Sequence, residues 1–367
     1  MQNHMDTAHD RMKFNNTHNY HHDHPHQPDV KLILCSFVEN FTCSMELKDE
    51  DDEWMMMKKL KETMNITKNK KKKGFLMNFH FVQEIVPKPK STYIPELIYI
   101  SYNHSCILLK VYDMNRLYNE ASMKDVIQVF DLYTREFKTT IDFSISENDS
   151  FEFALQENYD GHNNDAIIMH STSKHVYKCD LKTMLLQSGN EFKFMENYVW
   201  KSESCFLSPR RITILNSTNQ CYICDSNYSL VVLNLHFGTF IQRIDLGSQL
   251  SSFSHIDFVD SSTMVLCDDH GVSIYNRKDD SWVKMKTINN GHRYHSILCD
   301  SISHHIIISN QRAAGYIQIF TSSGELVKTF QAMLNEDFIT PRAMCINYLT
   351  GELLICDSSS QRVVFFQ

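Results

Sequence analysis

From about residue 74 to the end of the chain, short apolar runs alternate with polar turn residues. Runs of this kind predict β-strands rather than helices. They group in fours, and the unit that begins at Pro209 gives strands at 211–215, 221–224, 230–233 and 240–244. Later units give 255–259, 264–267, 272–275 and 282–286, then 296–299, 305–308, 316–320 and 326–330.

The strongest regularity is a repeat. Residues 209–235 recur without a gap as residues 341–367. Second strands of successive units end at Asp225, Asp268, Asn310 and Asp357. Their period of roughly 40–50 residues is typical of propeller blades. Because a repeat unit buries its apolar face only against its neighbours, this regularity predicts an architecture of stacked units.

Two looser units precede the repeat. Their predicted strands are 97–101, 106–112, 126–131 and 137–143, then 151–156, 166–170, 175–179 and 184–187, with an insertion around 191–205. The sixth and last unit stops at Gln367 after its third strand. A propeller protects its edges by closing into a ring, so we expect a strand at 75–82 to complete the last blade. The alternative closing strand is 31–38.

These elements predict an all-β fold, a six-bladed β-propeller of four-stranded blades, over residues 74–367. Residues 1–73 are expected to be a disordered or partly helical extension. Residues 1 to about 30 have too little apolar surface to offset the entropy of ordering, and the sequence leaves open whether residues 31–73 fold. Its features are a His-rich segment at 18–26, an acidic run at 49–53, a short helix at 54–64 and a basic run at Lys68–Lys73. The His-rich segment is interpreted as a polar tail with incidental metal affinity.

The formal net charge of −8 gives no general attraction to nucleic acid or acidic membranes. No segment resembles a signal peptide, so we expect a cytoplasmic protein, with nuclear import through Lys68–Lys73 as the alternative. The 11 cysteines lie mostly in apolar runs, which indicates buried thiols rather than disulfides. Cys221 and Cys224 point to opposite faces of a strand and do not predict a zinc site. Neither a metal nor a cofactor is expected.

The last unit resembles the NHL repeat, a blade type of six-bladed propellers. It has the Pro341-Arg342 opening, a strand ending in Ile355-Cys356-Asp357-Ser358, and Arg362-Val363 before aromatic residues. The unit at 209 departs from the pattern with Leu230 in place of that arginine. The resemblance implies a binding platform for proteins or RNA, in some members the substrate-recognition part of tripartite-motif or other RING ubiquitin ligases. Too few cysteines precede residue 100 for a RING here.

Basic residues gather where the innermost strands begin. The candidate binding residues are Arg210, Arg211, His255, Arg293, His295 and Arg342. Such positions crowd one end of the channel of a propeller, where arginine forks suit phosphates or acidic peptides. The alternative, implied by the resemblance, is that the arginine of the Pro-Arg opening joins adjacent blades. Asp225, Asp268 and Asp357 are interpreted as caps of turns.

The sequence has no nucleophile elbow, no phosphate-binding glycine loop and no His-Glu-x-x-His motif, so we expect a protein that is not an enzyme. We expect a monomeric platform for a protein partner, with RNA as the second candidate and no membrane partner. The alternative function is a calcium-dependent propeller hydrolase of the lactonase or gluconolactonase type. Its candidate ligands are Glu96, Asn216, Asp257, Asp300 and Asn347.

Overall fold

The computed structural model describes most of the chain after residue 71. The described ranges are 72–88, 93–113, 125–143, 151–170, 174–189, 191–193, 195–225, 229–246, 253–268, 271–279, 281–288, 294–310, 316–331, 333–334, 337–338 and 340–367. They belong to one compact unit, Lys71–Gln367. The features predicted within residues 1–71, including the alternative closing strand, lie outside the described residues. No helix of the described part is long and apolar enough to cross a membrane.

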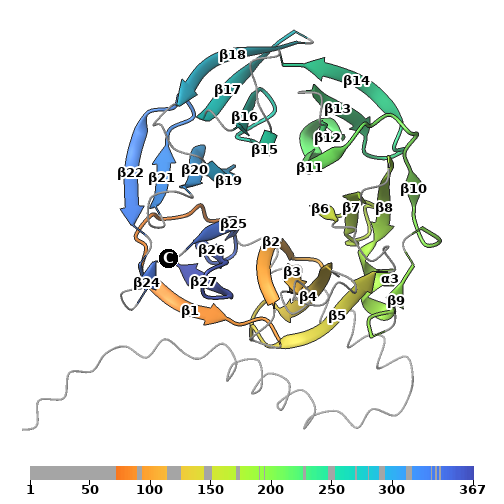
Figure 1. The fold of residues 1–367 in the computed structure, drawn as a ribbon, viewed down its shortest axis with the longest axis horizontal. Coiled ribbons are helices and arrows are strands. Elements are labelled where there is room, and N and C mark those ends of the chain that lie inside the picture. Colours follow the sequence, from red (N-terminus) through yellow and green to blue (C-terminus); the bar gives the residue numbers. More distant parts are fainter. Residues whose placement is uncertain are drawn as a thin grey trace, which may run out of the picture. The chain divides into compact units, whose positions relative to one another are not determined.

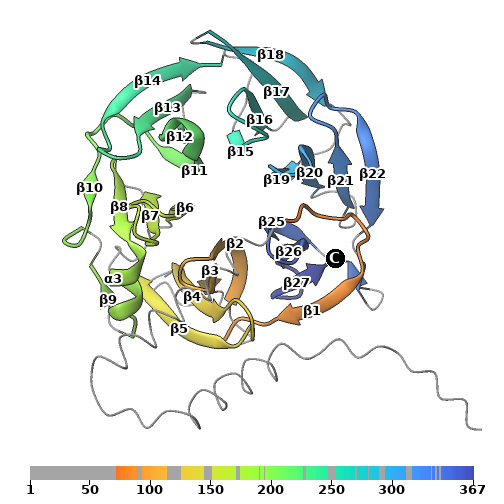
Figure 2. The same cartoon turned by 180° about the vertical axis from the view of Figure 1, so that it is seen from behind.

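Six blades, each with four antiparallel strands, surround a central channel (Figures 1 and 2). This arrangement confirms the predicted fold class. The innermost strands of the six blades are β2 (Tyr93–Ser101), β6 (Glu152–Gln156), β11 (Pro209–Leu215), β15 (Phe253–Phe258), β19 (Tyr294–Asp300) and β25 (Pro341–Asn347).

The other strands follow outwards from the channel. Blade 1 continues with β3 (Cys106–Asp113), β4 (Asp125–Asp131) and β5 (Phe137–Phe143), and blade 2 with β7 (Ala166–His170), β8 (Val176–Asp180) and β10 (Trp200–Lys201). Blade 3 continues with β12 (Gln220–Asp225), β13 (Ser229–Asn234) and β14 (Phe240–Asp245), and blade 4 with β16 (Thr263–Asp268), β17 (Gly271–Lys278) and β18 (Ser281–Ile288). Blade 5 continues with β20 (His305–Asn310), β21 (Tyr316–Phe320) and β22 (Leu326–Gln331), and blade 6 with β26 (Glu352–Asp357), β27 (Arg362–Phe366) and β1 (Phe81–Ile85). A small hairpin pairs β23 (Met333–Leu334) with β24 (Asp337–Phe338).

Burial follows the place of each strand in its blade. The second strands are covered on both faces, and every residue of β26 is buried. The outer strands β14 and β22 instead leave most of their residues exposed. This difference explains why the second strands read as continuous apolar runs in the sequence, whereas the outer strands are mixed.

The repeated aspartates cap the ends of second strands. The carboxylate of Asp225 accepts backbone hydrogen bonds from Leu207 at 3.1 Å and Ser208 at 2.8 Å, just before β11. In blade 6, Asp357 accepts the equivalent bond from Thr340 at 3.0 Å. Each aspartate thereby joins the second strand of its blade to the segment that leads into the innermost strand. Their predicted structural role is confirmed.

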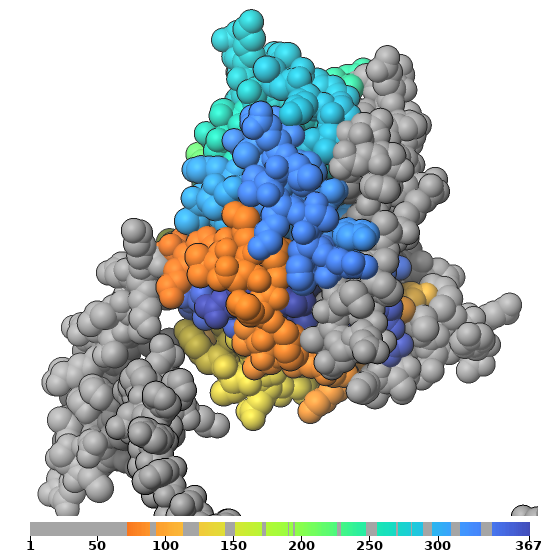
Figure 3. All heavy atoms as spheres, turned by 90° about the vertical axis from the view of Figure 1, so that its left-hand side faces the viewer, coloured from red at the N-terminus to blue at the C-terminus, as the bar shows by residue number. Residues whose placement is uncertain are grey.

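The ring is closed from the N-terminal side, by a strand later than predicted. β1 pairs with β27 over Phe81–Ile85, and the backbones of His80 and Gln367 exchange two hydrogen bonds of 3.0 Å. The predicted strand 75–82 is therefore wrong in its bounds. Positive φ angles at Met77 and Phe79 turn the backbone, so that residues 75–80 cannot form a regular strand. In Figure 3 this segment (orange) lies against the outer strand of blade 5 (blue).

Blade 2 differs from the prediction in its outer part. Residues 184–187, predicted as the outer strand, fall mostly in helix α3 (Leu181–Leu186), which Asp180 caps by accepting from the Thr183 N–H. Leu181 and Met184 are both buried, a spacing that suits a helix and not a strand. The outer strand is β10, inside the segment taken as an insertion. A further strand of that segment, β9 (Glu191–Phe192), pairs in parallel with β5 of blade 1.

Candidate functional site

Two of the predicted rim arginines join neighbouring blades. Arg211 on β11 pairs with Glu152 on β6 at 2.5 Å, and Arg342 on β25 pairs with Glu96 on β2 at 2.7 Å. All four residues lie near the N-terminal ends of innermost strands. Arg342 thus makes the blade-joining contact expected of the arginine in the Pro-Arg opening. In blade 3 this contact is made by Arg211, one residue after the opening, and not by Arg210.

Lys110 connects the two ion pairs. Its side chain is fully buried, and its Nζ lies 2.9 Å from Asp125, 3.0 Å from Glu96 and 3.9 Å from Glu152. Burial opposes the charge of Lys110, but Glu152, Asp125 and Glu96 raise its pKa overall. With Arg211 and Arg342, the cluster contains equal numbers of acidic and basic side chains. This end of the channel is therefore mixed in charge.

The structure brings only some of the predicted rim residues together. Arg210 is exposed. His255 lines the channel, and its register on β15 matches that of Arg211 on β11. Arg293 and the side chain of His295 lie outside the described part.

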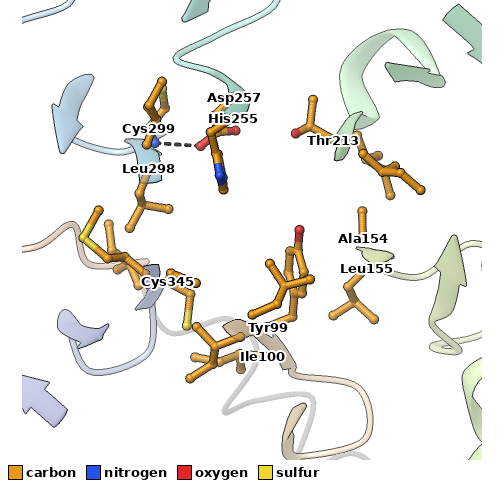
Figure 4. A pocket seen from close by; sticks show the side chains of 18 of the residues that line it. Tyr99, Ile100, Ala154, Leu155, Thr213, His255, Asp257, Leu298, Cys299 and Cys345 are labelled. Atoms are coloured by element: carbon orange, nitrogen blue, oxygen red, sulfur yellow. Dashed lines mark hydrogen bonds between the residues drawn. The ribbon is translucent and has the colours of Figure 1, made fainter. Parts of the chain in front are cut away.

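The channel contains a cavity of about 240 Å³ lined by residues of all six innermost strands. Strand pairing shows which lining residues are equivalent in the six blades. Going round the ring from blade 1, this middle layer consists of Tyr99, Ala154, Thr213, Asp257, Leu298 and Cys345. In Figure 4 the side chains of this layer surround a common space.

Asp257 is the acidic member of this layer. Its carboxylate accepts the backbone N–H of Cys299 in blade 5 at 2.7 Å and that of Phe258 at 2.8 Å. Burial raises the pKa of the Asp257 carboxyl to about 6, although both hydrogen bonds act in the opposite direction. Burial raises the pKa of the Tyr99 hydroxyl, and the negative charge of Asp257 raises it further. This hydroxyl points into the cavity (Figure 4).

The layer contains three polar and three apolar side chains, with Ala154 of blade 2 between Tyr99 and Thr213. Tyr99, Thr213 and Asp257 belong to blades 1, 3 and 4, whereas Leu298 and Cys345 belong to blades 5 and 6. Burial raises the pKa of the Cys345 thiol, which therefore stays neutral near pH 7. The cavity can thus accept a molecule with one polar end and an apolar body.

The residues proposed as calcium ligands do not converge. Glu96 belongs to the ion cluster, and Asp300 accepts the backbone N–H of Phe75 at 3.0 Å. Asn347 accepts the backbone N–H of Leu349, and Asn216 begins the 3₁₀ turn η2 (Asn216–Thr218). Within the described ranges, no group of three or more His, Cys, Asp and Glu side chains is placed to hold a metal ion.

The carboxylate of Asp257 should lower stability near neutral pH. Because its folded-state pKa lies above the ordinary value of 3.8, the native state binds more protons than the unfolded chain between about pH 4 and 6. Stability therefore falls as the pH rises through this range. Asp257→Asn is expected to remove this slope. The amide offers one acceptor oxygen to the two backbone N–H groups that the carboxylate binds, so the unfolding free energy at pH 7 should change by less than about 3 kcal/mol.

Thermal unfolding at pH 4, 5, 6 and 7 measures this effect. Asp245→Asn, on the exposed end of β14, is the matched control and should leave the slope unchanged. An Asp257→Asn protein with the wild-type pH dependence would contradict the expectation.

A second feature is a group of exposed apolar side chains on blades 2 and 3. We call Tyr198, Val199, Phe237 and Phe240 the aromatic patch; their exposed fractions are 44%, 48%, 71% and 44%. Trp200 lies beneath it and donates from its indole nitrogen to the Leu235 carbonyl oxygen at 3.0 Å. The backbone of Gly238 lies on the Trp200 ring, where an added Cβ would approach within 2.4 Å. The turn of blade 3 that carries Phe237 therefore packs directly on Trp200 of blade 2.

A buried lysine also joins blade 3 to blade 2. Lys178 donates to the Leu235 carbonyl oxygen at 3.1 Å, and its Nζ lies 4.5 Å from the centre of the Tyr159 ring. Burial lowers the pKa of Lys178 to about 8. The turn that carries Phe237 is thus fixed against blade 2 by two side chains.

Comparisons with known proteins support the fold. No family model matches the chain, and no curated protein matches it in sequence. The crystal structure of the β-propeller domain of Cps50 (Swd1) from Myceliophteria thermophila matches with a TM-score of 0.53 and 8% identity, over 78% of this chain and 99% of that chain. The C-terminal WD40 domain of Sif2 matches with a TM-score of 0.50 and 10% identity, over 77% and 83%. At such identities the likeness shows a β-propeller and does not single out the NHL type.

Proposed function

We propose that this chain is a non-catalytic platform that binds a protein partner through the aromatic patch. The observation that supports this proposal is the exposure of Tyr198, Phe237 and Phe240 on a surface fixed by Trp200. Aromatic side chains are enriched at protein interfaces, where they supply much of the binding energy. A rigid surface also loses little conformational entropy on binding.

A protein partner is favoured over RNA by the state of the arginines. RNA binding by the rim would need free basic side chains to contact phosphates. Arg211 and Arg342 are instead paired with Glu152 and Glu96. The resemblance of residues 209–235 and 341–367 to the NHL repeat favours substrate recruitment in ubiquitin-dependent turnover as the setting, and this setting remains a prediction.

The variant Tyr198→Ser/Phe237→Ser/Phe240→Ser tests the patch in the full chain. We expect it to remain folded, because all three side chains are exposed, and to lose the partner proteins captured by the wild type. The measurement is quantitative proximity labelling with and without ribonuclease, together with thermal unfolding.

Val283→Ser/Met285→Ser is the matched control. Both side chains are exposed on β18 of blade 4, away from the patch, with exposed fractions of 42% and 61%. The control should retain the wild-type partners. Retention of all partners by the patch variant, or their loss on ribonuclease treatment, would overturn the proposal.

A further inference from the structure

The middle of the channel contains an acidic group without a cationic partner. Among the described residues, no Lys, Arg or His side chain forms an ion pair with Asp257. Glu152, toward the end of the channel that holds the ion cluster, is balanced by Arg211 at 2.5 Å, and Glu157, which also lines the cavity, is exposed. The negative charge of Asp257 is therefore available to attract a cationic ligand in the cavity.

The Asp257 carboxylate can accept further hydrogen bonds. An ionised carboxylate has about four acceptor positions, and two are used by the amides of Phe258 and Cys299. Most of Asp257 is buried, and its exposed part faces the cavity. The hydroxyls of Tyr99 and Thr213 point into the same space (Figure 4). A group with several N–H donors and a positive charge would satisfy these acceptors.

The remaining walls suit an apolar body. The Tyr99 ring offers an aromatic face, which attracts a cation as well as apolar groups. Leu298 of blade 5 and Cys345 of blade 6 lie between Asp257 and Tyr99 in the same layer. A volume of about 240 Å³ corresponds to about eight water molecules. A ligand with one charged group and a short chain or single ring therefore fits.

We propose that the central channel is a binding site for a small organic amine, with its ammonium group at Asp257 and its apolar body against Leu298 and Cys345. This site is separate from the aromatic patch on the outside of blades 2 and 3. A carboxylate that lowers the stability of the fold, yet faces a cavity, is the arrangement expected of a group kept for ligand binding.

Acidification should weaken amine binding. The titratable groups around Asp257 and the cavity are Tyr99, Tyr102, Glu152, Glu157, Arg211, His255, Cys299, Cys345 and Tyr348. Since the pKa of Asp257 is about 6, only about a tenth of it is ionised at pH 5. We therefore expect an amine to bind about tenfold more weakly at pH 5 than at pH 7.5.

Calorimetric titration of the full chain with phenethylamine at pH 7.5 tests the proposal. Two probes of similar shape, 2-phenylethanol and 3-phenylpropionate, separate the effect of charge from that of the ring. We expect phenethylamine to bind at least tenfold more tightly than either. Asp257→Asn should weaken phenethylamine binding roughly tenfold or more, whereas Asp245→Asn should leave it unchanged.

Thermal unfolding of Asp257→Asn verifies that the variant is folded at the temperature of the titration, so that a loss of binding reports on the carboxylate. Equal binding of phenethylamine and 2-phenylethanol would overturn the proposal. So would wild-type amine affinity of Asp257→Asn, or no binding at millimolar phenethylamine. Loss of protein partners by the patch variant has no bearing on these outcomes, so the two proposals fail independently.

Discussion

Deletion of residues 72–88 is expected to leave no cooperatively folded propeller. The deletion removes β1, the fourth strand of blade 6, and with it Phe75 and Phe79. These two rings are 3% and 8% exposed and lie in a core shared by blades 5 and 6, where Phe79 stacks on Phe330 at 3.8 Å. Loss of one buried phenylalanine costs about 3–5 kcal/mol, so the whole deletion should exceed the stability of an ordinary domain.

Two substitution variants separate the contribution of a buried ring from that of the exposed side chains of β1. Phe79→Ala should lower the unfolding free energy by about 3–5 kcal/mol. Phe81→Thr/Val82→Thr keeps the backbone of β1 and changes side chains that are 46% and 41% exposed, so it should cost less than about 1 kcal/mol. Far-UV circular dichroism and thermal unfolding measure all three. Cooperative melting of the deleted protein at the wild-type temperature would show that the ring does not depend on its closing strand.

The closing strand also shows where sequence reasoning reaches its limit. The repeat at 209–235 and 341–367 identifies a blade that lacks its fourth strand, so closure from the N-terminal side follows from topology. The bounds of that strand depend on tertiary packing. Phe75 and Phe79 look like strand residues, but the packing of blades 5 and 6 draws both rings inwards and turns the backbone between them. The hydrophobic pattern alone cannot distinguish an irregular segment that packs aromatic rings into a core from a β-strand.

The outer part of blade 2 differs from the prediction for a related reason. A short apolar run such as Met184–Leu186 fits a strand or a helix equally well. The missed signal was Asp180, which begins α3 as an N-cap. The outer strand β10 has only two residues, Trp200 and Lys201, and no periodic pattern can reveal so short an element.

The candidate sites were only partly accessible from the sequence. Arg211 and His255 can be placed near one end of the channel by counting from the repeated aspartates, but the acids that pair with the arginines come from other blades. Asp257 was considered as a calcium ligand, whereas Tyr99 and Thr213 were missed. Once strand pairing is known, all three occupy equivalent positions in their blades. The aromatic patch depends on the fold of the irregular segment before β10 and had no sequence signal.

Replacement of Lys110 by methionine is expected to lower the unfolding free energy by about 3–5 kcal/mol. The change retains the apolar volume and leaves the acidic side chains of Asp125, Glu96 and Glu152 without their shared cation. Removing one partner of a buried ion pair is costly because the remaining charge stays buried. The effect should extend beyond blade 1, since Glu152 and Glu96 also hold the arginines of blades 3 and 6.

The pH dependence identifies the cause of this loss. In the wild type, burial opposes the charge of Glu152, but Arg211 and Lys110 lower its pKa overall below the ordinary 4.5. Its contribution to stability is therefore lost only as the pH falls through this lowered value. The raised pKa of Lys110 similarly maintains its contribution until the pH rises above 10.5. In Lys110→Met the three carboxylates face only Arg211 and Arg342, so one negative charge is left uncompensated, and the protein should become more stable as the pH is lowered from 7 to 5.

Chemical unfolding at pH 5 and pH 7 measures both the loss and the reversed slope. Lys138→Met is the matched control in the same blade, because the Lys138–Asp131 pair of 2.8 Å is 42% and 21% exposed and should contribute less than about 1 kcal/mol. Adding Asp125→Asn to Lys110→Met should recover part of the stability by removing one uncompensated charge. Equal tolerance of Lys110→Met and Lys138→Met would mean that water reaches the cluster and that the ring is held together by apolar packing alone.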